Sequence, residues 1–434
     1  MPNRRSFLKS LTLPAAAVGF PAIVPASALG LDGAVPASDR VTLASIGVGW
    51  MGGSHVDAFL KLDGAQYVAL ADVDDEHAAE NKAKIDKKYG NSDCKTYRAF
   101  EEVLSRKDID AVSIAVPDHW HGIVAYSAAR AGKDIYCEKP LAHNFAEGRA
   151  MSDAVTKYQR IFQTGSWQRS TANFRQACEL VRNGRIGKIT KVEVGLPGGW
   201  TDFAKTKDQD QITLPPAHVD YERWMGPSQE MPFIMARFHK NWRWNLNTGG
   251  GQLMDWVGHH VDIAHWGMGW DATGPVEIEG KGEYPARDAM WNSAGKYWID
   301  YKYADGTPMV IAGGYNEIRG GTKWIGSEGW IFVTRAKLEA SNPECIKPGS
   351  DTGPLKLTVS NNHYQQFIEC VKSRQETLTP AHVALRSATP GWLGQISMLT
   401  GRKLKWDPVK MELAGDAAAS KLLSREQRMP WHLA

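Results

Sequence analysis

The sequence contains little cysteine, and the cysteines that it has are not paired. Zinc sites and redox motifs place two cysteines a few residues apart, and no such pair occurs here. The five cysteines are Cys94, Cys137, Cys178, Cys345 and Cys370. An odd number spread over 434 residues excludes a disulfide framework, although an oxidising compartment would leave room for one disulfide. We therefore expect buried thiols.

An excess of charge of one sign is also missing. The 51 Lys and Arg residues nearly balance the 48 Asp and Glu residues, and no basic run stands out. Arg4, Arg5 and Lys9 account for the whole formal net charge of +3, so the chain beyond them is neutral. Neutrality argues against nucleic acid or an anionic membrane as a partner, and it favours a small, uncharged substrate.

Long hydrophobic runs are absent after the first 29 residues, so no later segment is expected to cross a bilayer. Residues 1–28 have the pattern of a twin-arginine export signal: Arg4 and Arg5 precede a mildly apolar stretch, and Ala26-Ser27-Ala28 offers small residues for cleavage. Three prolines interrupt the stretch, which argues against a membrane anchor. We predict export to the periplasm and no membrane contact after cleavage.

A glycine-rich turn is the most informative segment that is present. The apolar run from Ala44 to Ile46 continues into Gly47-x-Gly49-x-x-Gly52, the pattern of a strand, phosphate loop and helix start in a dinucleotide-binding unit. A second apolar run ends in Asp72, at the distance where an acidic residue holds the adenosine ribose.

The cofactor prediction follows from these residues. A carboxylate at Asp72 accepts hydrogen bonds from both ribose hydroxyls and repels a 2′-phosphate, so the sequence favours NAD over NADP. The loop residues predicted to contact the cofactor are Gly47, Gly49, Trp50, Met51 and Gly52.

Strands and helices alternate from Arg40 to about Thr164, which predicts an α/β fold with an N-terminal Rossmann domain, a doubly wound parallel sheet. After Gly187 longer alternating runs predict a C-terminal α/β domain with a large open, mainly antiparallel sheet. These runs are Lys188–Leu196, Val276–Tyr284, Tyr297–Tyr303, Met309–Gly313 and Trp324–Thr334. The predicted boundaries are a signal peptide at 1–28, the Rossmann domain at 40–165, the second domain at 166–405 and a C-terminal arm at 406–434.

Polar residues follow two of the predicted parallel strands, where doubly wound folds bind ligands. The first group includes Pro117 and His121, and the second is Glu138-Lys139-Pro140, whose proline is a candidate for a cis bond. Lys139 is a compact cation that can hold a substrate hydroxyl near the cofactor, although most lysines are simply exposed. Pro117, His121, Glu138 and Lys139 are therefore predicted cofactor contacts.

A third group follows Gly249-Gly250-Gly251. Asp255 and His259 are four residues apart and would share one face of a helix, where the carboxylate raises the basicity of the imidazole. Such a histidine can act as general base on an alcohol. The alternative is a zinc site formed by Asp255, His259 and His260. However, adjacent histidines point in different directions, and no cysteine assists. We predict no metal.

Together these motifs resemble those of the Gfo/Idh/MocA oxidoreductases, named for glucose-fructose oxidoreductase and inositol dehydrogenase. The resemblance rests on the glycine loop, on Glu138-Lys139-Pro140 and on the Gly-Gly-Gly segment with Asp255-x-x-x-His259. It implies a catalytic trio of Lys139, Asp255 and His259. It also implies a Rossmann domain followed by a domain whose open sheet often forms an oligomer interface, so we expect a homo-oligomer.

The expected activity is NAD-dependent oxidation of a secondary alcohol of a sugar or related polyol. The seventeen tryptophans make stacking on sugar faces plausible. The predicted substrate residues are Trp167, Arg169, Trp242, Trp244 and His260. The alternative is a redox-neutral glycosidase, in which transient oxidation is followed by elimination, water addition and return of the hydride. A nucleotide sensor without catalysis would need a broken trio, and all three members are present.

Overall fold

A computed structural model describes residues 36, 39–347 and 349–433. The predicted export signal lies outside the described residues. The chain separates into two units, Met1–Arg40 and Val41–Ala434, and the second contains both sheets.

The first part of this unit contains a six-stranded sheet in which every pairing is parallel. The strand order is β3-β2-β1-β4-β5-β6, so the order reverses between β1 and β4. This is the doubly wound topology that the alternating pattern predicts. The strands are β1 (Val41–Ile46), β2 (Ala65–Ala71), β3 (Lys95–Tyr97), β4 (Ala111–Ile114), β5 (Asp134–Cys137) and β6 (Phe162–Thr164).

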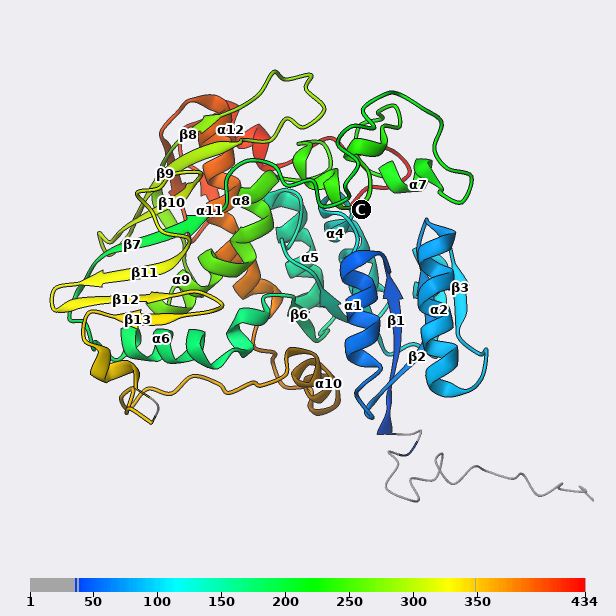
Figure 1. The fold of residues 1–434 in the computed structure, drawn as a ribbon, viewed down its shortest axis with the longest axis horizontal. Coiled ribbons are helices and arrows are strands. Elements are labelled where there is room, and N and C mark those ends of the chain that lie inside the picture. Colours follow the sequence, from blue (N-terminus) through cyan, green and yellow to red (C-terminus); the bar gives the residue numbers. More distant parts are fainter. Residues whose placement is uncertain (1–35, 37–38, 348, 434) are drawn as a thin grey trace, which may run out of the picture. The chain divides into compact units, whose positions relative to one another are not determined.

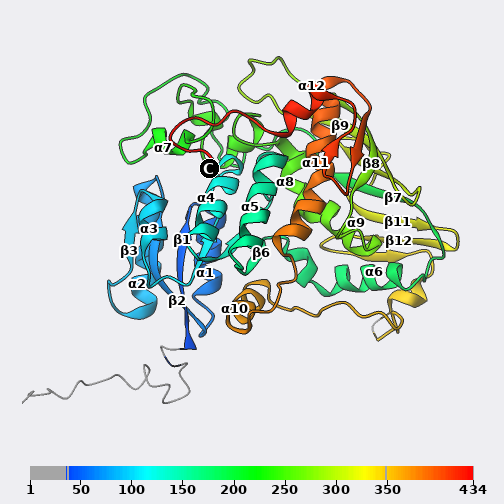
Figure 2. The same ribbon diagram turned by 180° about the vertical axis from the view of Figure 1, so that it is seen from behind.

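Helices cover both faces of this sheet (Figures 1 and 2). One face packs against α1 and α2, and the other packs against α3, α4 and α5. The helices are α1 (Trp50–Phe59), α2 (Asp75–Tyr89), α3 (Phe100–Ser105), α4 (Asp118–Arg130) and α5 (Phe145–Lys157). A late helix, α10 (His363–Ser373), completes the first face, because Phe367 and Ile368 are buried in the same core as β1 and α1.

A nine-stranded sheet forms the second part, in the order β13-β12-β11-β7-β10-β9-β8-β14-β15. Only β7 and β10 pair in parallel, and all other pairs are antiparallel. The strands are β7 (Ile189–Leu196), β8 (Pro275–Glu283), β9 (Lys296–Tyr303), β10 (Pro308–Gly313), β11 (Gly321–Gly326), β12 (Gly329–Val333), β13 (Leu338–Ala340), β14 (Leu404–Asp407) and β15 (Glu412–Leu413). The single strand predicted for Trp324–Thr334 is wrong: a turn at Ser327 and Glu328 divides the run into a hairpin, where Trp324 pairs with Ile331.

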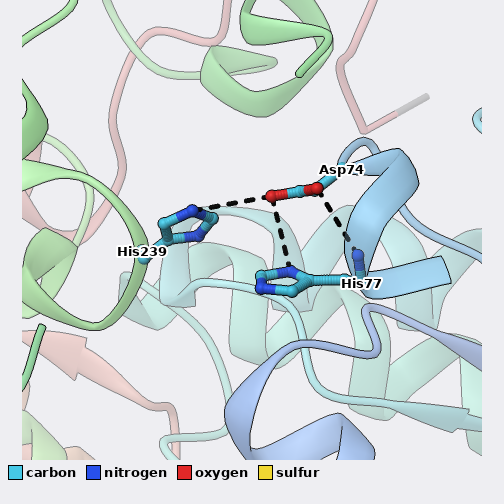
Figure 3. Close-up of side chains that lie close together, drawn as sticks. All are labelled: Asp74, His77 and His239. Atoms are coloured by element: carbon cyan, nitrogen blue, oxygen red, sulfur yellow. Dashed lines mark hydrogen bonds and ion pairs between the residues drawn. The ribbon is translucent and has the colours of Figure 1, made fainter. Parts of the chain in front are cut away.

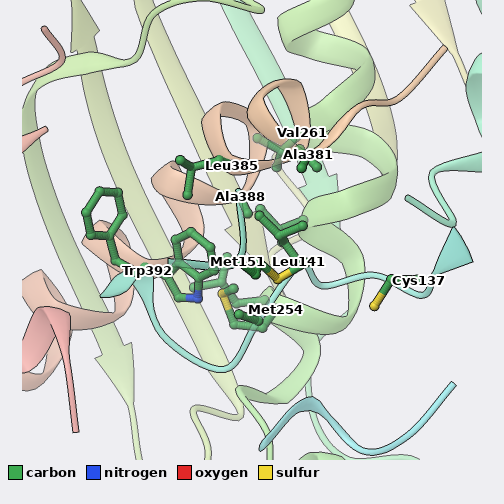
Figure 4. Close-up of a cluster of buried hydrophobic side chains, with 14 of the residues drawn as sticks. Cys137, Leu141, Met151, Met254, Val261, Ala381, Leu385, Ala388 and Trp392 are labelled. Atoms are coloured by element: carbon green, nitrogen blue, oxygen red, sulfur yellow. The ribbon is translucent and has the colours of Figure 1, made fainter. Parts of the chain in front are cut away.

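Helices of the second part join the two sheets through one hydrophobic core. Figure 4 shows Met151 of α5 and Met254 of α8 beside Leu385 and Trp392 of the long helix α11. The helices of this part are α6 (Ala172–Arg182), α8 (Gly251–Trp256), α9 (Asp262–Met268) and α11 (Ala381–Thr400). Because α5 and α8 share this core, the residues that follow β5 are held against those of α8.

Two later segments return to the Rossmann part. The crossing segment, residues 197–250, leaves β7, carries the short helix α7 (Tyr221–Met225) and pairs with the end of β2 through Asp220 N to Val73 O and Asp75 N to His218 O. The tail after β15 includes α12 (Ala417–Ser420) and lies on α4 and α5, where Arg425 donates to Glu147.

The structure bears on two expectations from the sequence, one on the cysteines and one on membrane-spanning segments. All five cysteines are free thiols; four are buried as expected, whereas Cys345 is half-buried. No helix among the described residues is long and apolar enough to span a bilayer.

Candidate active site

A cavity of about 620 Å³ opens at the carboxyl ends of the parallel strands, next to the point where the strand order reverses. Doubly wound folds bind their ligands at this position. The glycine loop, the ends of β2, β4 and β5, the crossing segment and α8 all contribute to its wall. It therefore collects residues from three well-separated regions of the sequence.

The glycine loop fits a dinucleotide at one end of the cavity. Gly47 has φ of +77°, and a Cβ atom there would lie 2.8 Å from the Ala115 carbonyl oxygen, so only glycine is accommodated. Gly49 precedes α1 and leaves its first amide groups without a side-chain cap, which suits a pyrophosphate. Gly47, Gly49, Trp50 and Met51 line the cavity. Gly52 does not, because it packs against the Gly47 carbonyl.

Asp72 lies at the end of β2 and faces the same cavity. One carboxylate oxygen accepts from Val48 N at 2.6 Å and the other from Asp74 N at 2.9 Å, so the side chain is fixed by backbone donors. Burial raises the pKa of Asp72, while His77 and these two amides act in the opposite direction. The site can accept from ribose hydroxyls, as the sequence predicts.

Lys139 and Asp255 meet at the opposite end. The Lys139 ammonium donates to the Asp255 carboxylate at 2.9 Å and to the Asp255 carbonyl at 2.8 Å. Arg243 of the crossing segment donates to the same carboxylate oxygen at 3.0 Å. Burial by itself would raise the pKa of Asp255, but Lys139 and Arg243 hold it well below its usual value. Asp255 is thus a permanent anion between two cations.

His259 follows on a π-helical turn, Val257–Val261, rather than on a continuous α-helix. Gly258 of this turn lies against Lys139, and a Cβ atom there would come within 2.6 Å of the Lys139 Cβ. Burial, together with Lys139 and Arg335, lowers the pKa of His259 well below its usual value, although Asp255 acts in the opposite direction. The expectation that Asp255 makes this imidazole more basic is therefore wrong in net effect, since desolvation outweighs the carboxylate.

The remaining predicted cofactor residues support the strand ends. Pro117, His121 and Glu138 line the cavity, and the Lys139–Pro140 bond is cis. His121 donates through Nδ1 to the Pro140 carbonyl at 2.6 Å. Glu138 is buried and paired with His55 Nε2 at 2.9 Å. These contacts fix the chain that carries Lys139.

Two of the five predicted substrate residues, Trp167 and Trp242, line the cavity. Trp167 contacts His259 edge to face, with ring centroids 6.3 Å apart. Trp242 is mostly buried and stacks against the Arg243 guanidinium, whose central carbon lies 4.3 Å from the ring centroid.

The other three are buried outside the cavity, and the structure contradicts their prediction as substrate contacts. Trp244 is fully buried and donates to the Thr201 carbonyl. His260 stacks on Trp256 and packs near Phe174. Trp244 is part of the packed core. The π turn directs the His260 side chain away from that of His259.

Arg169 is the third of these corrections. Its guanidinium is 2% exposed and donates to both carboxylate oxygens of Asp262, each at 2.8 Å, and to both oxygens of Asp271 at 2.8 and 3.0 Å. With two acidic partners and no access to the cavity, Arg169 is a buried structural cation.

Arg335 and Arg243 line the cavity but were not predicted from the sequence. Arg335 follows β12 and lies between two indoles, 4.8 Å from the Trp167 ring centroid and 4.7 Å from that of Trp256. No described carboxylate pairs with it, and its Nε donates to Gln168 at 3.0 Å. No motif marks these positions, because the fold alone brings the arginines to the cavity.

A glycine cradle at a strand switch point, in one cavity with Lys139, Asp255 and His259, defines a dinucleotide-dependent oxidoreductase. More specifically, the chain belongs to the Gfo/Idh/MocA oxidoreductase family. Residues 41–166 match the family's NAD-binding Rossmann fold, and residues 170–433 match its C-terminal alpha/beta domain.

Three relatives are similar over part of their length. The chain is 32% identical over 143 residues to a myo-inositol 2-dehydrogenase of Thermotoga maritima, covering 33% of this chain and 41% of the relative. It is 32% identical over 238 residues to a levoglucosan dehydrogenase of Pseudarthrobacter phenanthrenivorans, covering 53% and 52%. It is also 32% identical over 208 residues to a glycosyl hydrolase family 109 protein of Shewanella pealeana, covering 43% and 44%. The matched segments span about half of each relative or less.

Among solved structures, the fold is similar to the WlbA dehydrogenase of Bordetella pertussis, which was solved in complex with NADH and UDP-GlcNAcA. The TM-score is 0.64 at 18% identity, and the match covers 85% of this chain and 98% of that one.

Proposed function

We propose that this protein oxidises a secondary alcohol of a sugar or related polyol, with NAD as hydride acceptor. The observation that carries the proposal is the contact between Lys139 and Asp255, with His259 beside it, at the far end of the cavity from the glycine loop. The names of the inositol and levoglucosan dehydrogenases support a polyhydroxylated substrate.

Each member of the trio has a distinct role. Lys139 Nζ has a third proton beyond the two that it donates to Asp255, and this proton can hold the reacting hydroxyl oxygen. His259 lines the cavity and its ring is neutral, so the imidazole can accept the hydroxyl proton. Asp255 holds the Lys139 ammonium in place. Bound NAD supplies the hydride acceptor.

The tryptophans and Arg335 form the walls around this position. Trp167 and Trp256 hold the Arg335 guanidinium between them at the cavity wall, and this guanidinium has donors beyond the one bonded to Gln168. We propose that Arg335 and the two indoles orient the ring that carries the reacting hydroxyl.

A redox-neutral glycosidase is the second candidate, favoured by the similarity to the family 109 glycosyl hydrolase. The same residues serve both reactions, because each begins with removal of a hydroxyl proton and a hydride. In the glycosidase, oxidation acidifies the neighbouring C–H bond, elimination expels the leaving group, water adds and the hydride returns.

Two further proposals concern the whole protein. The twin-arginine pattern in residues 1–28 supports export to the periplasm, where a tightly bound NAD would be recycled by a second substrate rather than by a cellular pool. The nine-stranded open sheet supports association into a homo-oligomer, and static light scattering tests this proposal.

The experiment for the proposed activity uses protein purified without added nucleotide and then loaded with NAD. It is mixed with a panel of free sugars, polyols and aryl glycosides while the near-ultraviolet absorbance of reduced nicotinamide is followed. Lasting reduction by a free sugar or polyol is the expected result. Release of the aryl group without lasting reduction supports the glycosidase instead, and the absence of both overturns both candidates.

A further inference from the structure

A second polar cluster lies at the glycine-loop end of the cavity, away from Lys139 and Asp255. Figure 3 shows that it consists of Asp74, His77 and His239, whose side chains point toward one another. Asp74 and His77 belong to the start of α2, whereas His239 belongs to the crossing segment. All three residues line the cavity.

The two carboxylate oxygens of Asp74 have different surroundings. Oδ1 caps α2 by accepting from Glu76 N at 3.0 Å. Oδ2 faces His77 Nδ1 at 3.7 Å and His239 Nε2 at 3.5 Å. Both distances exceed the usual 2.7–3.2 Å range of an N–H···O hydrogen bond. The imidazoles are thus aimed at this oxygen but are not optimally bonded to it.

These separations suit a shared metal ion. With ligand bonds of about 2.0–2.2 Å, two ligand atoms of a tetrahedral zinc site lie roughly 3.3–3.6 Å apart. All three candidate ligand atoms lie within 4.8 Å of one another. A modest closure of the two imidazoles would complete three corners of such a site.

We propose that Asp74, His77 and His239 bind a divalent cation of the zinc type, with the fourth position open to the cavity. Two imidazole nitrogens and one carboxylate oxygen are a donor set that Zn²⁺ accepts, and a water or a nucleotide oxygen can take the open position.

A neighbouring group of Asp74, Glu76 and His218 is the weaker alternative for this ion. His218 Nε2 lies 3.9 Å from Asp74 Oδ1, the oxygen already used by the helix cap, and Glu76 is exposed. His77 and His239 instead share the oxygen that the cap leaves free.

The position of the ion gives it a function. His239 lies on the crossing segment, whereas Asp74 and His77 lie at the start of α2, so an ion bound to all three would add a link between that segment and the Rossmann part beside Asp72 and Gly49. Gly49 lies directly against His77, since a Cβ atom at Gly49 would come within 3.3 Å of that ring. The ion would therefore slow release of the dinucleotide.

The test uses the full chain without an affinity tag, treated with a chelator, dialysed and titrated with Zn²⁺ by calorimetry. We expect one equivalent to bind and Co²⁺ to give the absorption bands of a tetrahedral site. His77→Ala and His239→Ala should each weaken Zn²⁺ binding by about 100-fold or more. Asp74→Asn keeps a helix-capping side chain but removes the charge, and it should also weaken binding.

His382→Ala is the matched control, because this exposed histidine pairs only with Glu376 and lies outside the cavity. It should bind Zn²⁺ like the wild type. Circular dichroism identifies any variant that does not fold, in which case Asp74→Asn decides. The proposal is overturned if the wild type does not bind Zn²⁺ stoichiometrically, or if the folded variants bind it as well as the wild type does. In either case the three side chains form only ordinary imidazole–carboxylate ion pairs. Neither outcome depends on turnover, so the proposed oxidation is tested separately.

Discussion

Lys139, Asp255 and His259 take different parts in the proposed reaction, and single substitutions separate these parts. Lys139 holds the hydroxyl oxygen, His259 accepts its proton and Asp255 fixes Lys139 through two hydrogen bonds to one residue. None of the three belongs to the glycine loop. Loss of catalysis should therefore leave nucleotide binding intact.

We expect His259→Ala and Lys139→Ala to lower kcat by about 10²–10⁴-fold, the range for loss of an acid–base group. NADH affinity, measured by fluorescence titration, should stay within a few-fold of wild type. His260→Phe is the control, because His260 stacks on Trp256 outside the cavity and phenylalanine keeps an aromatic ring at this position. Near-normal kcat in both trio variants would remove them from the mechanism.

Asp72→Asn should reduce the preference for NAD over NADP, because the variant loses the charge that repels a 2′-phosphate but keeps an acceptor for Val48 N. A change of about tenfold in the ratio of dissociation constants corresponds to about 1.4 kcal/mol. Asp57→Asn, on an exposed carboxylate of α1 outside the cavity, should leave the ratio unchanged. An unaltered ratio for Asp72→Asn contradicts the assignment.

Asp118 should make stability depend on pH. It is 3% exposed, and burial raises its pKa to about 7. As the pH rises above about 4, the unfolded chain releases this proton while the folded protein keeps it, so stability falls by up to about 1.4 kcal/mol per pH unit until about pH 7.

Asp118→Asn removes this proton and keeps the shape of the side chain. Urea unfolding at about pH 5 and about pH 8 should show that the variant gains stability over the wild type at the higher pH. An advantage of the same size at both pH values contradicts the buried-acid explanation.

At the scale of elements, buried polar contacts hold short segments in place. Arg169 ties the turn after β6 to α9 through Asp262, and Gly258 allows Lys139 to pack on the π turn. The sequence shows an arginine and a glycine at these positions but not the partner that each will meet. This is why Arg169 was assigned to the substrate.

Arg169→Ala should lower the free energy of unfolding by about 3–5 kcal/mol, because it leaves Asp262 buried without its cation. The double variant Arg169→Leu with Asp262→Leu should lose less than the single variant, since the fully buried carboxylate is removed and only Asp271, which is partly exposed, loses its partner. Denaturant unfolding measures both values. A large rise in KM without loss of stability would return Arg169 to the substrate site.

At the scale of the whole molecule, the proposed export and the proposed catalysis would be linked through the cofactor. A folded protein carried by the twin-arginine route can take bound NAD with it, and the crossing segment lines one side of the cavity that would hold it. On that proposal, residues on both sides of the cavity, from β2 to Arg335, are folded together before export.

Replacement of Arg4 and Arg5 by lysine should keep the protein in the cytoplasm while preserving its activity in lysates. Cell fractionation with a periplasmic marker enzyme measures the distribution. The matched control replaces Lys9 by arginine, which keeps the charge and the arginine pair. Unchanged periplasmic recovery of the paired variant contradicts the predicted signal.

The sequence by itself determined the parallel Rossmann sheet, the glycine loop after its first strand, the acidic residue at the end of its second strand and four of the five strand runs in the second sheet. These features depend on local periodicity, on glycine conformations and on short motifs, which are properties of neighbouring residues. Lys139, Asp255 and His259 could be selected from the sequence for the same reason, since each stands in a recognisable local pattern.

Only the tertiary structure decided which polar residues face the cavity. Arg335, Arg243 and the Asp74–His77–His239 cluster come from distant segments with no shared motif, while Arg169, Trp244 and His260 find partners in the core. The pKa of His259 was decided in the same way, because desolvation and two neighbouring cations outweigh the carboxylate that its spacing suggested. Burial and long-range charge depend on how the chain packs, and sequence spacing does not record them.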